Sequence, residues 1–376
     1  MHPMYFLVIF VAAAPFVAAY FLNKFTRDNV PMIIALSLIA SLIFTGAVFA
    51  SLKSNIYDEE VLNGYVIGKE VHRFECPVNT SNPCENGYSC HCRTIRYSCG
   101  KDTCTRTECD RCYRYGWEKN YFVDSSIDGR RAYKISRVDA QGAVTPSRWD
   151  AVHQNDPVSR TRGYDNYLYT NRSLFSEDGK AAEKYAGKLP AYPIRIFDYY
   201  RIDRIVTVGN VKVDKDKWNA ILSDSVKVIG HTKEVNIVIV LTNGVQMDYA
   251  NALRRYWRGF KKNDVVVFAG VKPDGTIEWS RVMSWSKNSM VNVVTENDLL
   301  RIFKDKPLEP TEFVSTVTTN VTKYFSRIPM EEYSYLKNSI ALSGGQKAWL
   351  IVLWFALLLG TAFGVHRMNN FNSWRY

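Results

Sequence analysis

The chain has 376 residues, and its 48 Lys and Arg against 37 Asp and Glu give a formal net charge of +11. Hydrophobic residues make up 47% and charged residues 23%, which excludes wholesale disorder and fits about two or three folded domains. Three stretches, 1–23, 29–52 and 348–365, contain no Asp, Glu, Lys or Arg. Because about 20 apolar residues of helix span a bilayer core, this distribution argues against a purely soluble protein.

The first two apolar stretches follow each other closely and predict a transmembrane hairpin over residues 1–52. A secretory signal is the alternative for the first stretch, but it lacks a positively charged leader and its apolar run is too long. The third stretch predicts a transmembrane helix over 348–366, followed by a short tail, 367–376. The chain is therefore expected to be α+β and membrane-anchored, with three transmembrane helices.

The basic residues beside the three predicted spans indicate an orientation. Four of them lie in the hairpin loop and the tail: Lys24, Arg27, Arg367 and Arg375. The positive-inside rule then predicts a cytoplasmic loop and tail, with residues 53–347 outside as an ectodomain. Lys53 and Lys347 flank the membrane on the opposite side and weaken the bias.

A small Cys-rich β module is predicted over 53–145. It holds all eight cysteines: Cys76, Cys84, Cys90, Cys92, Cys99, Cys104, Cys109 and Cys112. The segment around them has too little aliphatic content to form its own core, so covalent bonds or a metal must hold it together. Runs with strand character lie on both sides of the cysteines, at 62–75, 118–126 and 131–140, and predict an antiparallel unit.

Two chemistries compete for these cysteines. An oxidising compartment would give up to four disulfides. Alternatively, CHC (Cys90, Cys92) and CDRC (Cys109, Cys112), separated by 16 residues, have the spacing of a zinc ribbon with one structural Zn²⁺. A hybrid would keep that zinc site and add disulfides in the two short loops, Cys76–Cys84 and Cys99–Cys104. The extracytoplasmic topology favours disulfides and the knuckle spacing favours zinc, so both remain open.

Two further readings of this module are less favoured. His91 lies between two candidate ligands and is expected to face solvent. CDRC leads into the strand-like run YRYGWEKNYFV rather than a helix, which argues against thioredoxin-like redox chemistry. The stretch RCYRYGWEKNYF (111–122) has residue types that favour interfaces, but packing within the module is the preferred role.

A loop-rich linker is predicted over 146–194 and an α/β domain over 195–327. Helical spacing of apolar residues predicts a helix over 214–230, with Asp214 as its N-cap and Gly230 as its end. The other expected elements are strands at 205–209, 235–242, 265–271 and 277–285, and helices at 247–259 and 313–325. Strands separated by helices predict a parallel or mixed sheet covered by helices.

The run VNIVIVLTNGVQMDYANALRRYWRGFKKNDVVVFAG (235–270) resembles a TPM domain, a small α/β module usually tethered to a membrane on its extracytoplasmic side. Some TPM domains are linked to phosphatase activity or metal binding. The whole chain, through CHC, CDRC, YANAL, KKNDVVV and MSWSKN, also resembles membrane proteins encoded by tailed bacteriophages. That resemblance implies the host inner membrane, with residues 53–347 in the periplasm.

Catalytic signatures are missing from the sequence, which contains no GxSxG, HExxH or Walker A motif. LSGGQK (342–347) is similar to an ABC-transporter signature, but without a Walker motif it is interpreted as part of a juxtamembrane joint over 328–347. The acidic residues considered in the α/β domain, Asp203, Asp248, Asp264 and Asp298, show no tight pair with metal spacing, so no catalytic residue is assigned. Asp198, Asp203 and Asp264 are expected near the carboxyl ends of the strands, where α/β sites form.

The leading hypothesis is a non-enzymatic, membrane-anchored binding or scaffold protein. Its expected partners are the lipid bilayer and a protein, with no nucleic acid, because the excess positive charge fits a mixed, solvated surface. The alternative is a metal-assisted phosphatase or other hydrolase that uses carboxylates of the TPM-like domain. Convergence of several of its aspartates in one cleft would favour the hydrolase.

Overall fold

The structure is a computed structural model that describes residues 30–76, 84–100, 102–127, 133–139, 142–170, 183–340 and 342–372. The first predicted transmembrane span, 1–23, lies outside the described residues. The chain divides into two compact units. The helical unit comprises Met1–Asp58, Gly163–Ser176 and Pro329–Tyr376, and the sheet unit comprises Glu59–Arg162 and Glu177–Ile328.

Two long apolar helices, α2 (Val30–Ile56) and α9 (Gly344–Asn372), form most of the helical unit. Among the described residues, two segments are long and apolar enough to cross a membrane, Leu38–Ile56 and Gly344–Thr361. The helices pack against each other through Phe44, Val48 and Leu350. Two 3₁₀ helices also lie in the described part of this unit, η2 (Tyr167–Thr170) and η4 (Met330–Ser339).

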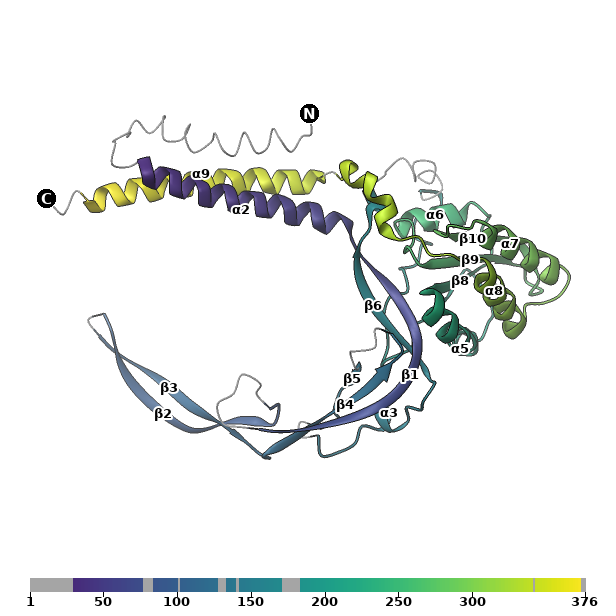
Figure 1. The fold of residues 1–376 in the computed structure, drawn as a ribbon, viewed down its shortest axis with the longest axis horizontal. Coiled ribbons are helices and arrows are strands. Elements are labelled where there is room, and N and C mark those ends of the chain that lie inside the picture. The colour runs from purple at the N-terminus through teal and green to yellow at the C-terminus, as the bar shows by residue number, and fades with distance from the viewer. Residues whose placement is uncertain are drawn as a thin grey trace. The chain divides into compact units, whose positions relative to one another are not determined.

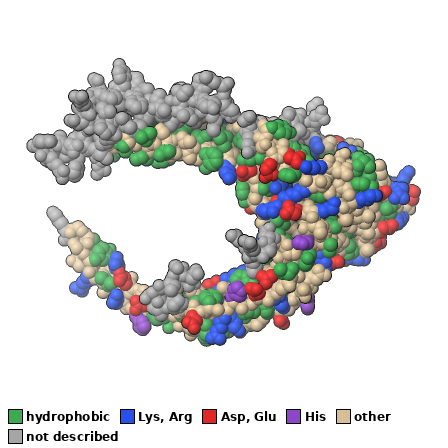
Figure 2. All heavy atoms as spheres, in the orientation of Figure 1, with side chains coloured by type: hydrophobic (Ala, Val, Ile, Leu, Met, Phe, Trp, Pro, Cys, Tyr) green, Lys and Arg blue, Asp and Glu red, His purple; other side chains and the backbone are tan. Residues whose placement is uncertain are grey.

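The outer surface of the α2–α9 pair is apolar. Leu42 is 73% exposed and Leu359 is 71% exposed, and hydrophobic side chains follow the described part of the pair in Figure 2. A core helix of a soluble protein would bury such residues, whereas a helix that is apolar on all sides is typical of a membrane span. Both helices extend past the predicted spans, which ended at 52 and began at 348, because polar residues at their ends continue the helical turns.

The predicted joint 328–347 is ordered where it meets α9. The Ser343 hydroxyl accepts a hydrogen bond from the Gln346 N–H at 3.2 Å, and the Gln346 side chain accepts one from the Ser343 N–H at 2.9 Å. This reciprocal pair is a capping box, which satisfies two backbone groups at the helix start. Gln346 also exchanges two hydrogen bonds of 2.8 Å with the Asn55 side chain at the end of α2. LSGGQK therefore joins the two helices.

The first sheet of the sheet unit has the strand order β5–β4–β1–β6. Strand β1 is antiparallel to β4, and β4 is antiparallel to β5. These strands are β1 (Tyr57–Glu75), β4 (Trp117–Ser125), β5 (Tyr133–Ile135) and β6 (Pro157–Asp165). The antiparallel unit predicted around the cysteines is thus present, but β6 comes from the segment predicted as a linker.

The predicted linker, 146–194, is partly folded. It contains helix α3 (Ser147–Asp150) and strand β6. The sequence of β6, PVSRTRGYD, has no apolar alternation over its length, and of its residues only Val158 and Ser159 are buried. Its strand conformation comes from its place beside β1, which sequence periodicity cannot reveal.

The second sheet has the order β10–β9–β8–β7, in which β7, β8 and β9 are parallel and β10 is antiparallel to β9. Every residue of β8 and β9 is buried, as expected for strands covered on both faces. The strands are β7 (Ile205–Val208), β8 (Asn236–Thr242), β9 (Asp264–Val271) and β10 (Ile277–Ser284). The predicted mixed sheet is confirmed.

Helices cover both faces of this sheet (Figure 1). One core contains residues of α5, α7 and α8, and the other contains residues of α6. The helices are α5 (Lys215–Lys233), α6 (Tyr249–Tyr256), α7 (Met290–Phe303) and α8 (Pro310–Tyr324). Asp214 caps α5 as predicted. The helix continues past Gly230 to Lys233, and its C-cap, Glu234, lies in the left-handed region. Helix α7 was not predicted.

Candidate functional site

The Cys-rich segment forms a long hairpin of β2 (Gly87–Cys99) and β3 (Asp102–Tyr113). The two strands pair antiparallel and make a sheet of their own. Three disulfides lie within the hairpin and one lies at its base: Cys90–Cys112, Cys92–Cys109, Cys99–Cys104 and Cys76–Cys84. The register shifts between Cys90 and Arg93, where His91 has a φ of 46°. The extra residue at this bulge lets both CHC cysteines reach β3.

The hairpin has almost no buried side chains. Along both strands every residue is exposed or half-buried. An isolated two-stranded hairpin is marginally stable in water. The disulfides therefore provide the stability that a hydrophobic core provides in other domains. The hairpin is thus a covalently held ribbon with two solvent-facing sides.

Of the two chemistries left open by the sequence, the arrangement fits disulfides rather than a zinc site on Cys90, Cys92, Cys109 and Cys112. The four cysteines are paired across the strands, and a disulfide sulfur is not a thiolate ligand. Both short-loop disulfides of the hybrid prediction are present. The His91 side chain is 78% exposed, in agreement with its expected orientation towards solvent.

The aspartates considered for hydrolysis do not form a shared site. In the described part of the chain, the groups close enough to share a metal ion are Cys90–His91–Cys112 and Cys76–Cys84–Glu118, which contain no aspartate. Most of the aspartates instead bond to neighbours on their own part of the fold: Asp198 to Arg148, Asp248 to Lys184 and Tyr185, Asp264 to Tyr192 and Asn236, and Asp298 to Arg301 and Asn320.

The expected position of these aspartates relative to the sheet was wrong. Asp264 is the first residue of β9, and Asp203 precedes β7, so both lie at the amino ends of the parallel strands. Asp264 accepts a hydrogen bond there from the Lys261 N–H at 2.8 Å, whereas the Asp203 side chain is exposed.

The carboxyl ends of β7 and β8 border a pocket of about 410 Å³, at the edge where α/β sheets usually bind ligands. It is lined by Gly187, Lys188, Leu189, Pro190, Thr207, Val208, Gly209, Asn243 and Val245. These residues include no carboxylate, imidazole or thiol. Lys188 and Thr207 are the lining residues whose side chains could serve as a base or nucleophile, and no carboxylate or imidazole lines the pocket beside them to activate either one.

A buried polar network occupies the opposite edge of the sheet. The Arg204 guanidinium is 1% exposed and donates to the Asn236 side chain at 3.3 Å. Asn236 in turn donates to Asp264 at 3.0 Å, and the Tyr192 hydroxyl donates to the same carboxylate at 2.9 Å. Asn236 thus links the buried cation to the buried anion. Further acceptors of Arg204 are the side chains of Asn63, Ser159 and Ser223.

Burial shifts the pKa values of both charged members of this network. Desolvation raises the pKa of Asp264 to about 6, although hydrogen bonds from Asn236, Lys261 and Tyr192 oppose the rise. Desolvation lowers the pKa of Arg204 to about 10, which leaves the guanidinium charged at neutral pH. Asp264 is therefore the group of this network that titrates nearest to physiological pH.

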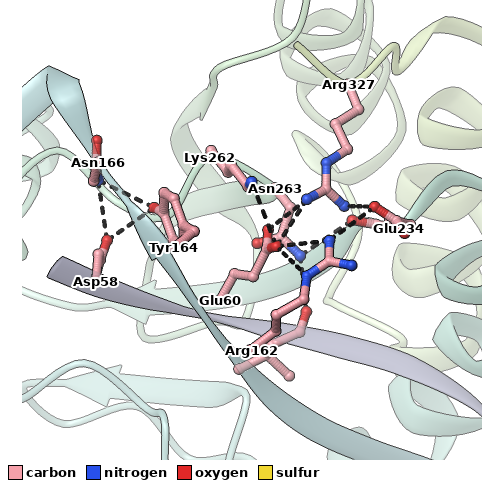
Figure 3. Close-up of polar contacts among 10 residues, drawn as sticks. Asp58, Glu60, Arg162, Tyr164, Asn166, Glu234, Lys262, Asn263 and Arg327 are labelled. Atoms are coloured by element: carbon pink, nitrogen blue, oxygen red, sulfur yellow. Dashed lines mark hydrogen bonds and ion pairs between the residues drawn. The ribbon is translucent and has the colours of Figure 1, made fainter. Parts of the chain in front are cut away.

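A second charged cluster, the Glu60 centre, surrounds a carboxylate with no exposed surface. Arg327 donates two hydrogen bonds to Glu60, at 2.8 and 2.9 Å, and Arg162 donates one at 2.9 Å. Lys262 Nζ lies 3.6 Å from the same carboxylate. Glu234 accepts from both arginines (Figure 3). Three cations and two carboxylates thus neutralise most of each other's charge.

The Glu60 centre joins parts of the sheet unit that are far apart in sequence. Glu60 is the second residue of this unit, Arg162 ends its first segment, and Arg327 is the second-to-last residue of its second segment. Three of the four places where the chain enters or leaves the sheet unit therefore lie beside one buried carboxylate. Because the chain continues into the helical unit at these places, this centre holds the ends of the sheet unit together.

Sequence reasoning missed both charged clusters. Glu60, Arg162 and Arg327 are separated by more than 100 residues and carry no periodic signal, so nothing local marks them. The capping box at Ser343 and Gln346 was detectable, because Ser-x-x-Gln before an apolar run is a helix-start pattern.

No protein-family model, curated protein or solved structure is significantly similar to the chain. The resemblances to TPM domains and to phage membrane proteins therefore remain predictions.

Proposed function

We propose that the chain is a membrane-anchored, non-enzymatic binding or scaffold protein that presents the sheet unit outside the cytoplasm. The observation that carries this proposal is the combination of apolar helices, exposed along their length, with a disulfide-held hairpin in the same chain. The resemblance to phage proteins further supports a phage-encoded protein at the host envelope, with the sheet unit in the periplasm.

The apolar helices support the anchoring. Exposed side chains such as Leu42, Phe49, Val352 and Leu359 would face water in a soluble protein. Each fully buried side chain of this size contributes about 1.5–3 kcal/mol, so a bilayer stabilises this surface strongly. The Asn55–Gln346 hydrogen bonds join the C-terminal end of α2 to the N-terminal end of α9. These polar side chains are suited to the membrane–water interface.

The disulfides support an extracytoplasmic location. Disulfides persist in oxidising compartments and are rare in the cytosol. In the described residues all eight cysteines are paired. The hairpin, which has no core, would lose its order in a reducing compartment. A location in the periplasm or another oxidising space is consistent with the predicted topology.

The polar groups support binding rather than hydrolysis. The hydrolase alternative depends on carboxylates that converge in one cleft, whereas Asp198, Asp248, Asp264 and Asp298 each bond to a different set of neighbours. The exposed hairpin, in contrast, offers backbone edges and charged side chains to a partner.

Membrane fractionation tests the anchoring. The full chain is expressed in a bacterium, and the cells are lysed without detergent. The chain is expected in the membrane pellet and is expected to resist extraction by alkaline carbonate. Recovery in the supernatant would overturn the proposal.

The detergent-purified chain, incubated with p-nitrophenyl phosphate and Mg²⁺, Mn²⁺ or Zn²⁺, is expected to show no turnover above a protein-free control, and sustained turnover would favour the hydrolase.

A further inference from the structure

The hairpin leaves two strand edges open. Strands β2 and β3 form a sheet of two strands, and no described strand pairs with the outer edge of either one (Figure 1). In an antiparallel pair, the backbone groups of alternate residues point away from the partner strand and can bond to another strand. Long open edges readily pair with other chains unless something blocks them.

The edge of β3 is suited to pairing. It is 12 residues long and contains no proline. Thr103, Thr105 and Thr107 recur at every second position and are exposed, and β-branched residues favour strand pairing. The disulfides fix the hairpin before any partner arrives, so little conformational freedom is lost when another strand adds to it.

The charges distinguish the two edges. Strand β2 carries Arg93 and Arg96 and no acidic residue, so an antiparallel pair of two β2 strands would bring only positive charges together. Strand β3 carries both signs: Asp102, Arg106, Glu108, Asp110 and Arg111. A two-fold axis through Thr107 places Arg106 of one copy opposite Glu108 of the other, and does so twice.

We infer that the β3 edge binds a second copy of this chain, with the two β3 strands antiparallel about Thr107. Four strands then form one continuous sheet, β2–β3–β3–β2, with complementary charges on either side of the axis. The contact is isologous, so it closes at two copies. Arg106 and Glu108 already form an ion pair within one chain, and the second copy adds the cross-strand pairs that fix the register.

Backbone hydrogen bonds provide the affinity and the ion pairs provide the specificity. Exposed ion pairs contribute about 0–1 kcal/mol each, whereas like charges directly opposite each other destabilise a strand pair. This inference deepens the proposed binding function by naming a partner, and it rests on that function for its context. A monomeric chain would overturn the pairing and would leave the fractionation result, and with it the anchoring, untouched.

Size-exclusion chromatography with multi-angle light scattering tests the inference on the full chain in detergent under non-reducing conditions. The wild-type polypeptide mass is expected to be twice the 43.1 kDa of one chain. Arg106→Glu and Glu108→Arg each place like charges opposite each other and are expected to return the mass to that of one chain. The double variant Arg106→Glu/Glu108→Arg exchanges the signs and is expected to restore the twofold mass.

Arg96→Glu on β2 is the matched control. It changes a similarly exposed arginine on the other strand and is expected to leave the mass at two copies. A head-to-tail contact between β2 and β3 would respond to Arg96→Glu and would extend beyond two copies, which would overturn the inference. A wild-type monomer, a dimer insensitive to both single variants, or a double variant that stays monomeric would overturn it as well. Intact mass confirms four disulfides in every variant.

Discussion

The carboxyl group of Asp264 makes the stability of the second sheet depend on pH. Its pKa in the folded protein is about 6, above the ordinary value of 3.8, mainly because burial disfavours the charged form. The folded state therefore binds this proton more tightly than the unfolded state does. The contribution of this group to stability is fully present below pH 3.8 and is lost as the pH rises towards 6.

The pH dependence of hydrogen exchange tests this linkage. The rise in the pKa of Asp264 from 3.8 to about 6 corresponds to about 3 kcal/mol. Deprotonation of Asp264 is therefore expected to lower the free energy of opening β8 and β9 by up to that amount between pH 4 and pH 7. Asp264→Asn cannot titrate and is expected to remove this part of the slope. An unchanged slope in the variant would show that other groups control it.

Glu60 illustrates how a buried anion can hold distant chain segments. Glu60→Gln keeps the shape of the side chain but removes the buried anion that faces Arg162, Arg327 and Lys262. Breaking a buried ion pair in this way costs about 3–5 kcal/mol. Hydrogen exchange in the full chain is expected to show this loss in β1 and β6.

Asp224→Asn is the control for Glu60→Gln, because Asp224 forms an ion pair with Lys227 while its own side chain is 69% exposed. Surface pairs contribute about 0–1 kcal/mol, so exchange in β1 and β6 is expected to stay unchanged. Equal effects of the two substitutions would contradict the structural role of the Glu60 centre.

At the scale of elements, Gln346 links α9 to α2. Gln346→Ala removes the capping box and the paired hydrogen bonds with Asn55. Hydrogen bonds between membrane helices contribute about 0.6–2 kcal/mol, and loss of a cap costs about 1 kcal/mol. The expected result is faster exchange in the first turn of α9, measured in detergent. Thr361→Ala, later in the same helix, is expected to leave that turn unchanged.

The hairpin depends on its cross-strand disulfides. The double variant Cys92→Ser/Cys109→Ser leaves no hydrophobic contact to replace the disulfide, because the side chains along both strands are exposed or half-buried. Exchange in β2 and β3 is expected to rise at least tenfold, whereas β8 and β9, which have cores of their own, keep their protection. Unchanged exchange in the hairpin would mean that the strands hold each other without the disulfide.

At the scale of the whole molecule, the oxidation state of the cysteines reports the location of the sheet unit. Alkylation of the intact membrane-bound chain is expected to label no thiol before reduction and eight after it, because all eight cysteines are paired. Intact mass spectrometry counts the labels. Four labelled thiols together with one zinc per chain, by elemental analysis, would instead support the ribbon site on Cys90, Cys92, Cys109 and Cys112.

Local patterns predicted those elements whose residues follow one period. The buried runs of β8 and β9, the N-cap at Asp214 and the apolar stretches of α2 and α9 were all evident, because burial on both faces or within lipid leaves a continuous apolar signal. Helix α7 was missed because a polar residue, Thr295, occupies one position of the buried stripe that Val291, Leu299 and Phe303 form. Strand β6 was not predicted because its pairing with β1, and not a pattern in its own sequence, makes it a strand.

Composition and periodicity are local properties, and they were enough to predict long apolar helices, a cysteine-dependent module and a mixed sheet covered by helices. The cysteine pairing, the position of the aspartates at the amino ends of the strands, and the contacts of Glu60 with Arg162 and Arg327 became evident only in the packed chain. Those contacts join residues from 5 to 267 positions apart, and the register and the sheet order that bring them together are properties of the whole packed chain.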